Sequence, residues 1–182
     1  MEWTSSALVA STSRRARRVE TIPSDGLTVD IQADEVERAA LAKFNDLPAV
    51  DRLVATFELR PRPGGAVDVS GEVAADVVQT CVVTLEPFTA TLVEPVDVRF
   101  APPEAFPTPD VGNERVNAAG EEDAPDPIVD GAIDLGALAA EFLTLGLDPY
   151  PRKPGVSFVS SSEGWSPEAS PFGELAGPKK GG

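Results

Sequence analysis

The side chain best suited to chemistry is Cys81, the only cysteine in a sequence of 182 residues that contains no histidine. A lone thiol at the end of an apolar stretch could be a nucleophile, a metal ligand or a small buried side chain. Without histidine, neither a Ser-His-Asp nor a Cys-His catalytic unit can be built. One cysteine also cannot form a structural zinc site or an intrachain disulfide. We therefore interpret Cys81 as a buried apolar residue, because no cationic neighbour in sequence would lower its pKa.

Carboxylates are the other groups that could carry out catalysis. Glu86 and Glu94 could form an acid–base pair, but a chain with 30 acidic residues offers many such pairs. The sequence has no loop with the spacing of a calcium hand, no phosphate loop and no dinucleotide fingerprint. We therefore predict no enzymatic activity, cofactor, metal site or small-molecule substrate.

Composition indicates one domain with irregular segments. The net charge is −15, hydrophobic residues make up 42%, and there are 18 prolines and 15 glycines. A chain of this length is typical of a single domain, and the high Pro and Gly content predicts that part of it is irregular. No apolar run reaches the ~20 residues that a bilayer-spanning helix needs, so we expect no membrane contact. The single cysteine suits a cytoplasmic location.

Two segments have the apolar spacing of helices. In residues 34–45, Asp34 is a suitable N-cap, and Val36, Ala40 and Phe44 share one face. A second helix should begin after Asp134 and end at Gly146. Its expected apolar face comprises Leu135, Leu138, Ala139, Phe142 and Leu145.

Three stretches between these helices alternate between apolar and polar residues, as half-buried strands do: residues 50–62, 66–82 and 88–100. Gly71 should mark a bulge or bend in the second stretch, and Pro95 should interrupt the third or place it at an edge. Short connections join the three stretches. The sequence therefore predicts an α+β fold: an antiparallel β-meander, which could curl into a partial barrel, packed with two helices.

Three regions lack this periodicity. Residues 101–131 are rich in proline and acidic side chains, and we predict a disordered acidic loop, either a solvated linker or a segment that binds a basic partner. Residues 1–18 form a basic segment, either a flexible or strand-forming end, a phosphate-contacting arm or an organellar transit peptide. Residues 159–182 are predicted to be a disordered tail, in which Trp165, Phe172 and Leu175 could dock on a partner or on the domain itself. The single domain would then span residues 19–158.

The stretch "GEVAADVVQTCVVTLEP" resembles the central motif of the YceD family, the large-subunit ribosomal RNA accumulation proteins of bacteria and plastids. Members show a G-x-V-x-A-x-V strand, a Cys-x-x-Cys pair and Leu-Glu-Pro. The motif positions here are Gly71, Cys81, Leu85, Glu86 and Pro87. Thr84 stands at the second cysteine, and a later cysteine pair is absent. The resemblance covers roughly residues 15–160. Because the pairs are missing, we interpret these motif residues as structural.

The resemblance implies a non-enzymatic ribosome-biogenesis factor that supports accumulation of large-subunit ribosomal RNA by binding RNA or a pre-ribosomal particle. Because a net charge of −15 opposes phosphate binding, RNA contact requires a local cationic surface. The candidate RNA-binding residues are Arg14, Arg15, Arg17, Arg18, Arg52, Arg60 and Arg62. The alternative is an acidic protein-interaction module, or a chaperone for a basic ribosomal protein.

Overall fold

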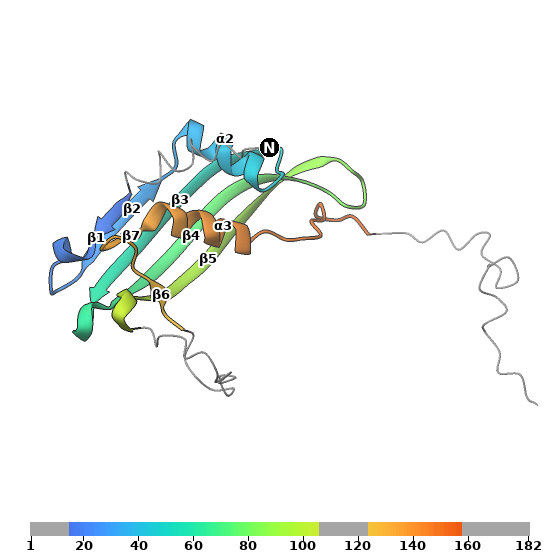
Figure 1. The fold of residues 1–182 in the computed structure, drawn as a ribbon. Coiled ribbons are helices and arrows are strands. Elements are labelled where there is room, and N and C mark those ends of the chain that lie inside the picture. Colours follow the sequence, from blue (N-terminus) through green and yellow to red (C-terminus); the bar gives the residue numbers. More distant parts are fainter. Residues whose placement is uncertain (1–14, 106–123, 158–182) are drawn as a thin grey trace, which may run out of the picture.

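The main structural unit is a curved five-stranded sheet. The structure is a computed structural model that describes residues 15–105 and 124–157 (Figure 1). The sheet has the order β2-β3-β4-β5-β6. Its strands are β2 (Leu27–Gln32), β3 (Ala49–Pro61), β4 (Val67–Thr80), β5 (Pro87–Ala101) and β6 (Asp126–Pro127). Neighbours are antiparallel except for β5 and β6, which are parallel. Two short strands, β1 (Ala16–Arg18) and β7 (Ala132–Asp134), form a separate antiparallel pair.

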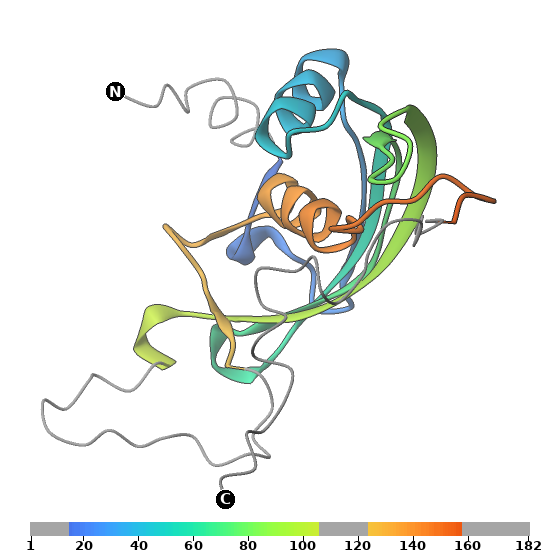
Figure 2. The ribbon, with the colours of Figure 1, turned by 90° about the vertical axis from the view of Figure 1, so that its right-hand side faces the viewer.

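Two helices lie on the concave side of this sheet, as Figure 2 shows. Helix α2 (Glu35–Phe44) begins with a capping box, in which the Asp34 side chain accepts the Glu37 N–H and the Glu37 carboxylate accepts the Asp34 N–H. Helix α3 (Leu135–Leu145) begins at Asp134, whose carboxylate accepts the N–H groups of Gly136 and Ala137, each at 3.0 Å. The predicted α+β fold is confirmed, and the sheet does not close into a barrel within the described ranges.

The core fills the space between the concave sheet face and α3. Phe57 and Leu59 of β3 and Leu135 and Leu143 of α3 are fully buried. The alternating residues of β4 that face the same way are also fully buried: Val67, Val69, Val73, Ala75 and Val77. This period-two pattern on two adjacent strands is what the sequence predicts, because burying apolar surface is the main favourable contribution to folding.

Of the bulge or bend expected at Gly71, the bulge is wrong. Gly71 pairs in regular register with Phe57 and Val96, and the only shift between β3 and β4 lies between Val50 and Arg52. The glycine is required for a different reason. A Cβ built at Gly71, where φ is +154°, would lie 2.0 Å from the backbone oxygen of Thr56. Two backbones approach each other closely at this point of the curved sheet. Pro95 lies within β5 without interrupting it. Because β6 pairs with β5 only at Phe100 and Ala101, Pro95 lies on an edge of the sheet formed by the described residues, as the other alternative predicted.

The buried faces of the two helices differ from the predicted ones. In α2, Leu41 and Ala42 are buried, whereas Val36 and Phe44 are 69% and 71% exposed. This helix packs chiefly on β3 at one side of the sheet, so only a narrow stripe of it is covered. In α3, Leu135, Leu138 and Ala139 are buried as predicted. The difference lies in the last turn, where Leu143, four residues after Ala139, is fully buried and Leu145 is 68% exposed.

The chain segments outside the meander also form strands. Strand β2, which the sequence did not reveal, pairs with β3 along its whole length. Strand β1 lies in the basic N-terminal segment, for which a strand-forming end was one of the alternatives. Residues 124–131, expected to belong to the acidic loop, include β6 and the buried Ile128. Residues 101–105 of the same predicted loop hold the end of β5 and a short 3-10 turn. Residues 106–123 of that loop, residues 1–14 and the whole of the predicted tail lie outside the described residues. Neither α2 nor α3 is long and apolar enough to cross a membrane.

Candidate functional site

Cys81 begins the turn that connects β4 to β5. The turn closes through two backbone hydrogen bonds: the Cys81 N–H donates to the Glu86 oxygen at 2.9 Å, and the Leu85 N–H donates to the Cys81 oxygen at 2.8 Å. Leu85 adopts a positive φ of 60°, which non-glycine residues seldom do. Glu86 and Pro87 then lead into β5. The four motif residues of this region therefore shape one tight connection.

A distant segment of the chain packs against this turn. The Val82 N–H donates to the Pro151 oxygen at 2.9 Å, and the Gln79 side-chain amide donates to the Asp148 oxygen at 3.2 Å. Lys153 makes two further contacts. Its side-chain ammonium group lies 3.0 Å from Glu86 Oε2, and its backbone N–H donates to Cys81 Sγ at 3.4 Å. The turn is thus connected to the segment that follows α3.

The Cys81 thiol is fully buried within this arrangement. A hydrogen bond from the Thr84 side chain and another from the Lys153 N–H lower the pKa of Cys81 to about 6, although burial opposes this change. A thiolate is an intrinsically good nucleophile, but a substrate cannot reach a sulfur with no exposed surface. The described residues also contain no group of three or more potential ligands that could hold a metal ion. The geometry favours a structural role, in which Sγ accepts hydrogen bonds.

We expect this thiolate to make stability depend on pH. Because folding lowers the Cys81 pKa, its contribution is fully present above the ordinary thiol pKa of ~8.5 and is lost as the pH falls through about 6. The difference in free energy of unfolding between the unmodified protein and Cys81→Ala should therefore grow from pH 6 to pH 8.5. Urea unfolding at several pH values measures it. A difference that does not change with pH would exclude a thiolate in the folded protein.

Three of the predicted RNA-binding arginines lie beside carboxylates of the protein itself. Arg15 contacts Glu37 of α2, and Arg52 lies 4.0 Å from Asp76 on β4. Arg60 lies 2.8 Å from Glu58. Arg17 and Arg18 are on β1, far along the chain from the β3 positions, and Arg14 lies outside the described residues.

Arg62 belongs to a charge cluster around Asp68. The Asp68 carboxylate accepts hydrogen bonds from Arg62 Nε at 2.6 Å and Arg99 Nε at 3.0 Å. Burial acts to raise the pKa of Asp68, but these two guanidinium groups outweigh it and lower the pKa below its usual value. Arg62 is therefore partly neutralised by a carboxylate, which reduces its attraction for phosphate.

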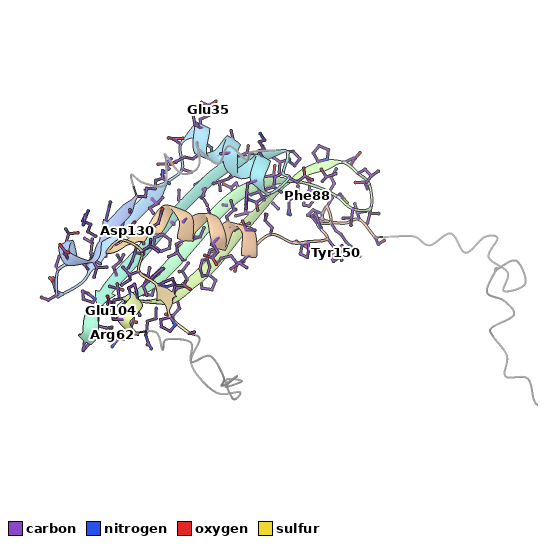
Figure 3. The ribbon with its side chains drawn as sticks, viewed as in Figure 1. Glu35, Arg62, Phe88, Glu104, Asp130 and Tyr150 are labelled. Carbon is purple, nitrogen blue, oxygen red and sulfur yellow. The ribbon has the colours of Figure 1, made fainter. Side chains whose placement is uncertain are left out.

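One concave feature of the described residues is an acidic groove of about 600 Å³ between β1, β6, β7 and α3. Its charged lining consists of four carboxylates and one guanidinium: Asp126, Asp130, Asp134, Glu141 and Arg18. Phe100, Ile133 and Leu138 contribute apolar surface to the same groove. Figure 3 labels Asp130 at this side of the molecule. Sequence reasoning missed the groove, because its carboxylates come from segments whose pairing the sequence pattern did not reveal.

Comparison with known proteins identifies one family. The family model described as "Large ribosomal RNA subunit accumulation protein YceD" matches residues 69–175, more than half of the 182-residue chain. The chain belongs to the YceD family. The YceD match begins in β4, includes the Cys81 turn and α3, and continues beyond the described residues. Helix α2 and strand β3 lie outside it, although the sequence resemblance included them. Neither the curated proteins nor the solved structures gave a match. The YceD description names a role in large ribosomal RNA subunit accumulation and no enzymatic activity.

Proposed function

We propose that this protein supports large-subunit ribosomal RNA accumulation as a cytoplasmic, non-catalytic factor, and that it binds a basic protein component of the pre-ribosomal particle at the acidic groove. The observation that carries this proposal is the groove itself. Carboxylates and apolar side chains line the groove together, which suits a peptide that carries lysine or arginine side chains among apolar ones. A basic ribosomal protein, bound by this factor before it assembles with RNA, would provide such a peptide.

Electrostatics supports a protein ligand over RNA. Affinity for RNA depends on cations that neutralise phosphates, and this chain has a net charge of −15. Four of the candidate arginines lie beside carboxylates of the protein itself: Arg15, Arg52, Arg60 and Arg62. A phosphate would have to compete with those carboxylates.

Direct RNA contact through β1 is the second candidate. Arg18 is exposed and Arg17 is half-buried, and within residues 15–105 and 124–157 neither side chain forms an ion pair. Together with Arg14, they could contact a phosphate backbone. Replacing Arg17 and Arg18 with glutamate would then weaken RNA binding and make it less sensitive to salt.

Binding of the full-length protein to two probes tests the proposal. The probes are the protein fraction extracted from purified large subunits and the deproteinised large-subunit RNA. We expect the protein fraction to bind. We also expect the groove variant Asp126→Asn, Asp130→Asn, Glu141→Gln to lose roughly 10- to 100-fold in affinity, because each exposed ion pair contributes up to ~1 kcal/mol. Asp134 is left unchanged because it caps α3.

A matched variant controls for the change in net charge. Asp51→Asn, Glu72→Gln, Asp97→Asn also removes three exposed carboxylates, but from the strands of the meander away from the groove. It should bind the protein fraction almost as the unmodified protein does. Equal losses in the two variants would show that only net charge matters. If the protein binds the RNA tightly, and replacing Arg17 and Arg18 with glutamate abolishes this binding, direct RNA contact through β1 is favoured.

A further inference from the structure

Exposed apolar side chains gather at one end of the molecule. Five of the eight large hydrophobic residues that are exposed in the described ranges belong to the turn after β4, the last residues of α2 and α3, and the segment after α3. We call this set the apolar end: Phe44, Val82, Leu85, Leu145 and Tyr150. Figure 1 shows these elements ending on the same side, and Figure 2 looks onto that side. Such a grouping of exposed apolar residues commonly marks a contact surface.

Hydrogen bonds hold the segments of the apolar end together. The Thr144 hydroxyl donates to Asn45 Oδ1 at 2.9 Å, which connects the ends of α3 and α2. The bond between the Val82 N–H and the Pro151 oxygen, at 2.9 Å, connects the turn to the segment that carries Tyr150. The exposed side chains are therefore presented by a fixed framework.

Leu85 is difficult to explain by the fold alone. It is 77% exposed and has a φ of +60°, a conformation in which asparagine or glycine would be less strained. The hydrogen bond from the Leu85 N–H to the Cys81 oxygen favours the turn, but the exposed leucine side chain gains little from burial in the described domain. A contact between this side chain and a further apolar segment would add the missing burial.

The chain itself provides an occupant. The described part stops at Ser157, four residues after Lys153, which binds the turn. The family match continues to residue 175 and so includes Trp165, Phe172 and Leu175. Trp165 lies eight positions after Ser157, which allows a reach of up to ~27 Å. We propose that residues 158–175 dock on the apolar end through Trp165, Phe172 and Leu175.

The docked segment would cover the large side chains that the fold leaves exposed at this end. It would also explain why the family match extends beyond the last described residue. This interaction is separate from the acidic groove, which lies between β6, β7 and α3, so it does not depend on the proposed function.

Fluorescence of Trp165 in the full-length protein tests the proposal. The sequence has two tryptophans, Trp3 and Trp165, so Trp3→Phe leaves Trp165 as the only reporter. We expect blue-shifted emission and protection from quenching by acrylamide. Leu85→Asn or Tyr150→Ser should each lower the docking equilibrium constant roughly tenfold, because each removes one large apolar contact. Asparagine tolerates the positive φ at position 85, so the turn should remain folded.

The control is Val93→Ser, which removes a 55% exposed valine from β5, outside the apolar end. It should leave the Trp165 signal unchanged, while circular dichroism confirms that every variant is folded. If acrylamide quenches Trp165 freely in the protein that carries only Trp3→Phe, docking is refuted. Protection that the Leu85 and Tyr150 changes do not reduce would place the segment elsewhere and refute the proposed surface. Protection that appears only at high protein concentration would mean docking on a second copy and would also contradict the proposal.

Discussion

Gly71→Ala should destabilise the protein by ~3–5 kcal/mol, in the range of the most damaging single substitutions. The added Cβ would lie 2.0 Å from the Thr56 oxygen and 3.0 Å from the Thr56 carbonyl carbon. Both are backbone atoms of β3, so neither can move aside as the end of a flexible side chain could. Strands β3 and β4 would have to separate at the centre of the sheet, where Phe57 and Val73 are fully buried.

Urea unfolding of Gly71→Ala and Gly131→Ala measures this effect against a matched control. Gly131 also has a positive φ, of +69°, but an added Cβ meets no atom within 4 Å. Its substitution should cost only ~1 kcal/mol of backbone strain. Similar losses in the two variants would mean that the close approach of β3 and β4 is absent in solution.

Leu143→Ala should cost ~2–5 kcal/mol, because it leaves a cavity where α3 packs on the sheet. Leu143 is fully buried, whereas Leu145, two residues later, is 68% exposed. Leu145→Ala should therefore change the free energy of unfolding by less than ~1 kcal/mol. The two variants delete the same atoms from the same helix. The difference between their free energies of unfolding, measured with heat or urea, therefore reflects burial alone. A larger loss in free energy of unfolding for Leu145→Ala than for Leu143→Ala would mean that Leu145, as the sequence pattern predicted, faces the sheet.

The meander could be predicted from sequence because its signals are local. Alternation through Leu53 and Phe57 and through Val67 and Val73 identifies two strands, and short connections make them antiparallel. The caps at Asp34 and Asp134 identify both helix starts. Local sequence does not determine which face of each helix is buried, because several apolar residues in each helix satisfy helical spacing. Packing against the sheet decides which of them are buried.

The candidate sites could not be predicted in the same way because they depend on long-range pairing. Lys153 meets Glu86 across 67 positions of sequence, and the segment around Pro127 joins β5 after the acidic stretch. The low pKa of Cys81 has this origin only in part: the larger effect comes from the nearby Thr84 side chain, and a second hydrogen bond comes from the distant Lys153. The sequence neighbours of Cys81 contain no cation, which is why the sequence alone indicated an ordinary buried thiol.

The absence of the other family cysteines suggests how the Cys81 turn is maintained. Thr84, which stands at the second motif cysteine, supplies a hydrogen bond to Cys81, and Lys153 supplies another. The ion pair between Lys153 and Glu86 adds a third connection between the same two segments. In this chain, hydrogen bonds and apolar packing account for the connection without a metal or disulfide among the described residues.

Crosslinking in cells, with the crosslinked partners sorted into protein and RNA, tests whether the acidic groove binds a basic protein. We expect residues that line the groove to crosslink to lysine-rich segments of large-subunit proteins. These crosslinks should disappear in the Asp126→Asn, Asp130→Asn, Glu141→Gln variant and persist in the Asp51→Asn, Glu72→Gln, Asp97→Asn control. Crosslinks to ribosomal RNA alone, or a protein that sediments free of every ribosomal particle and crosslinks to neither partner, would contradict binding at the groove.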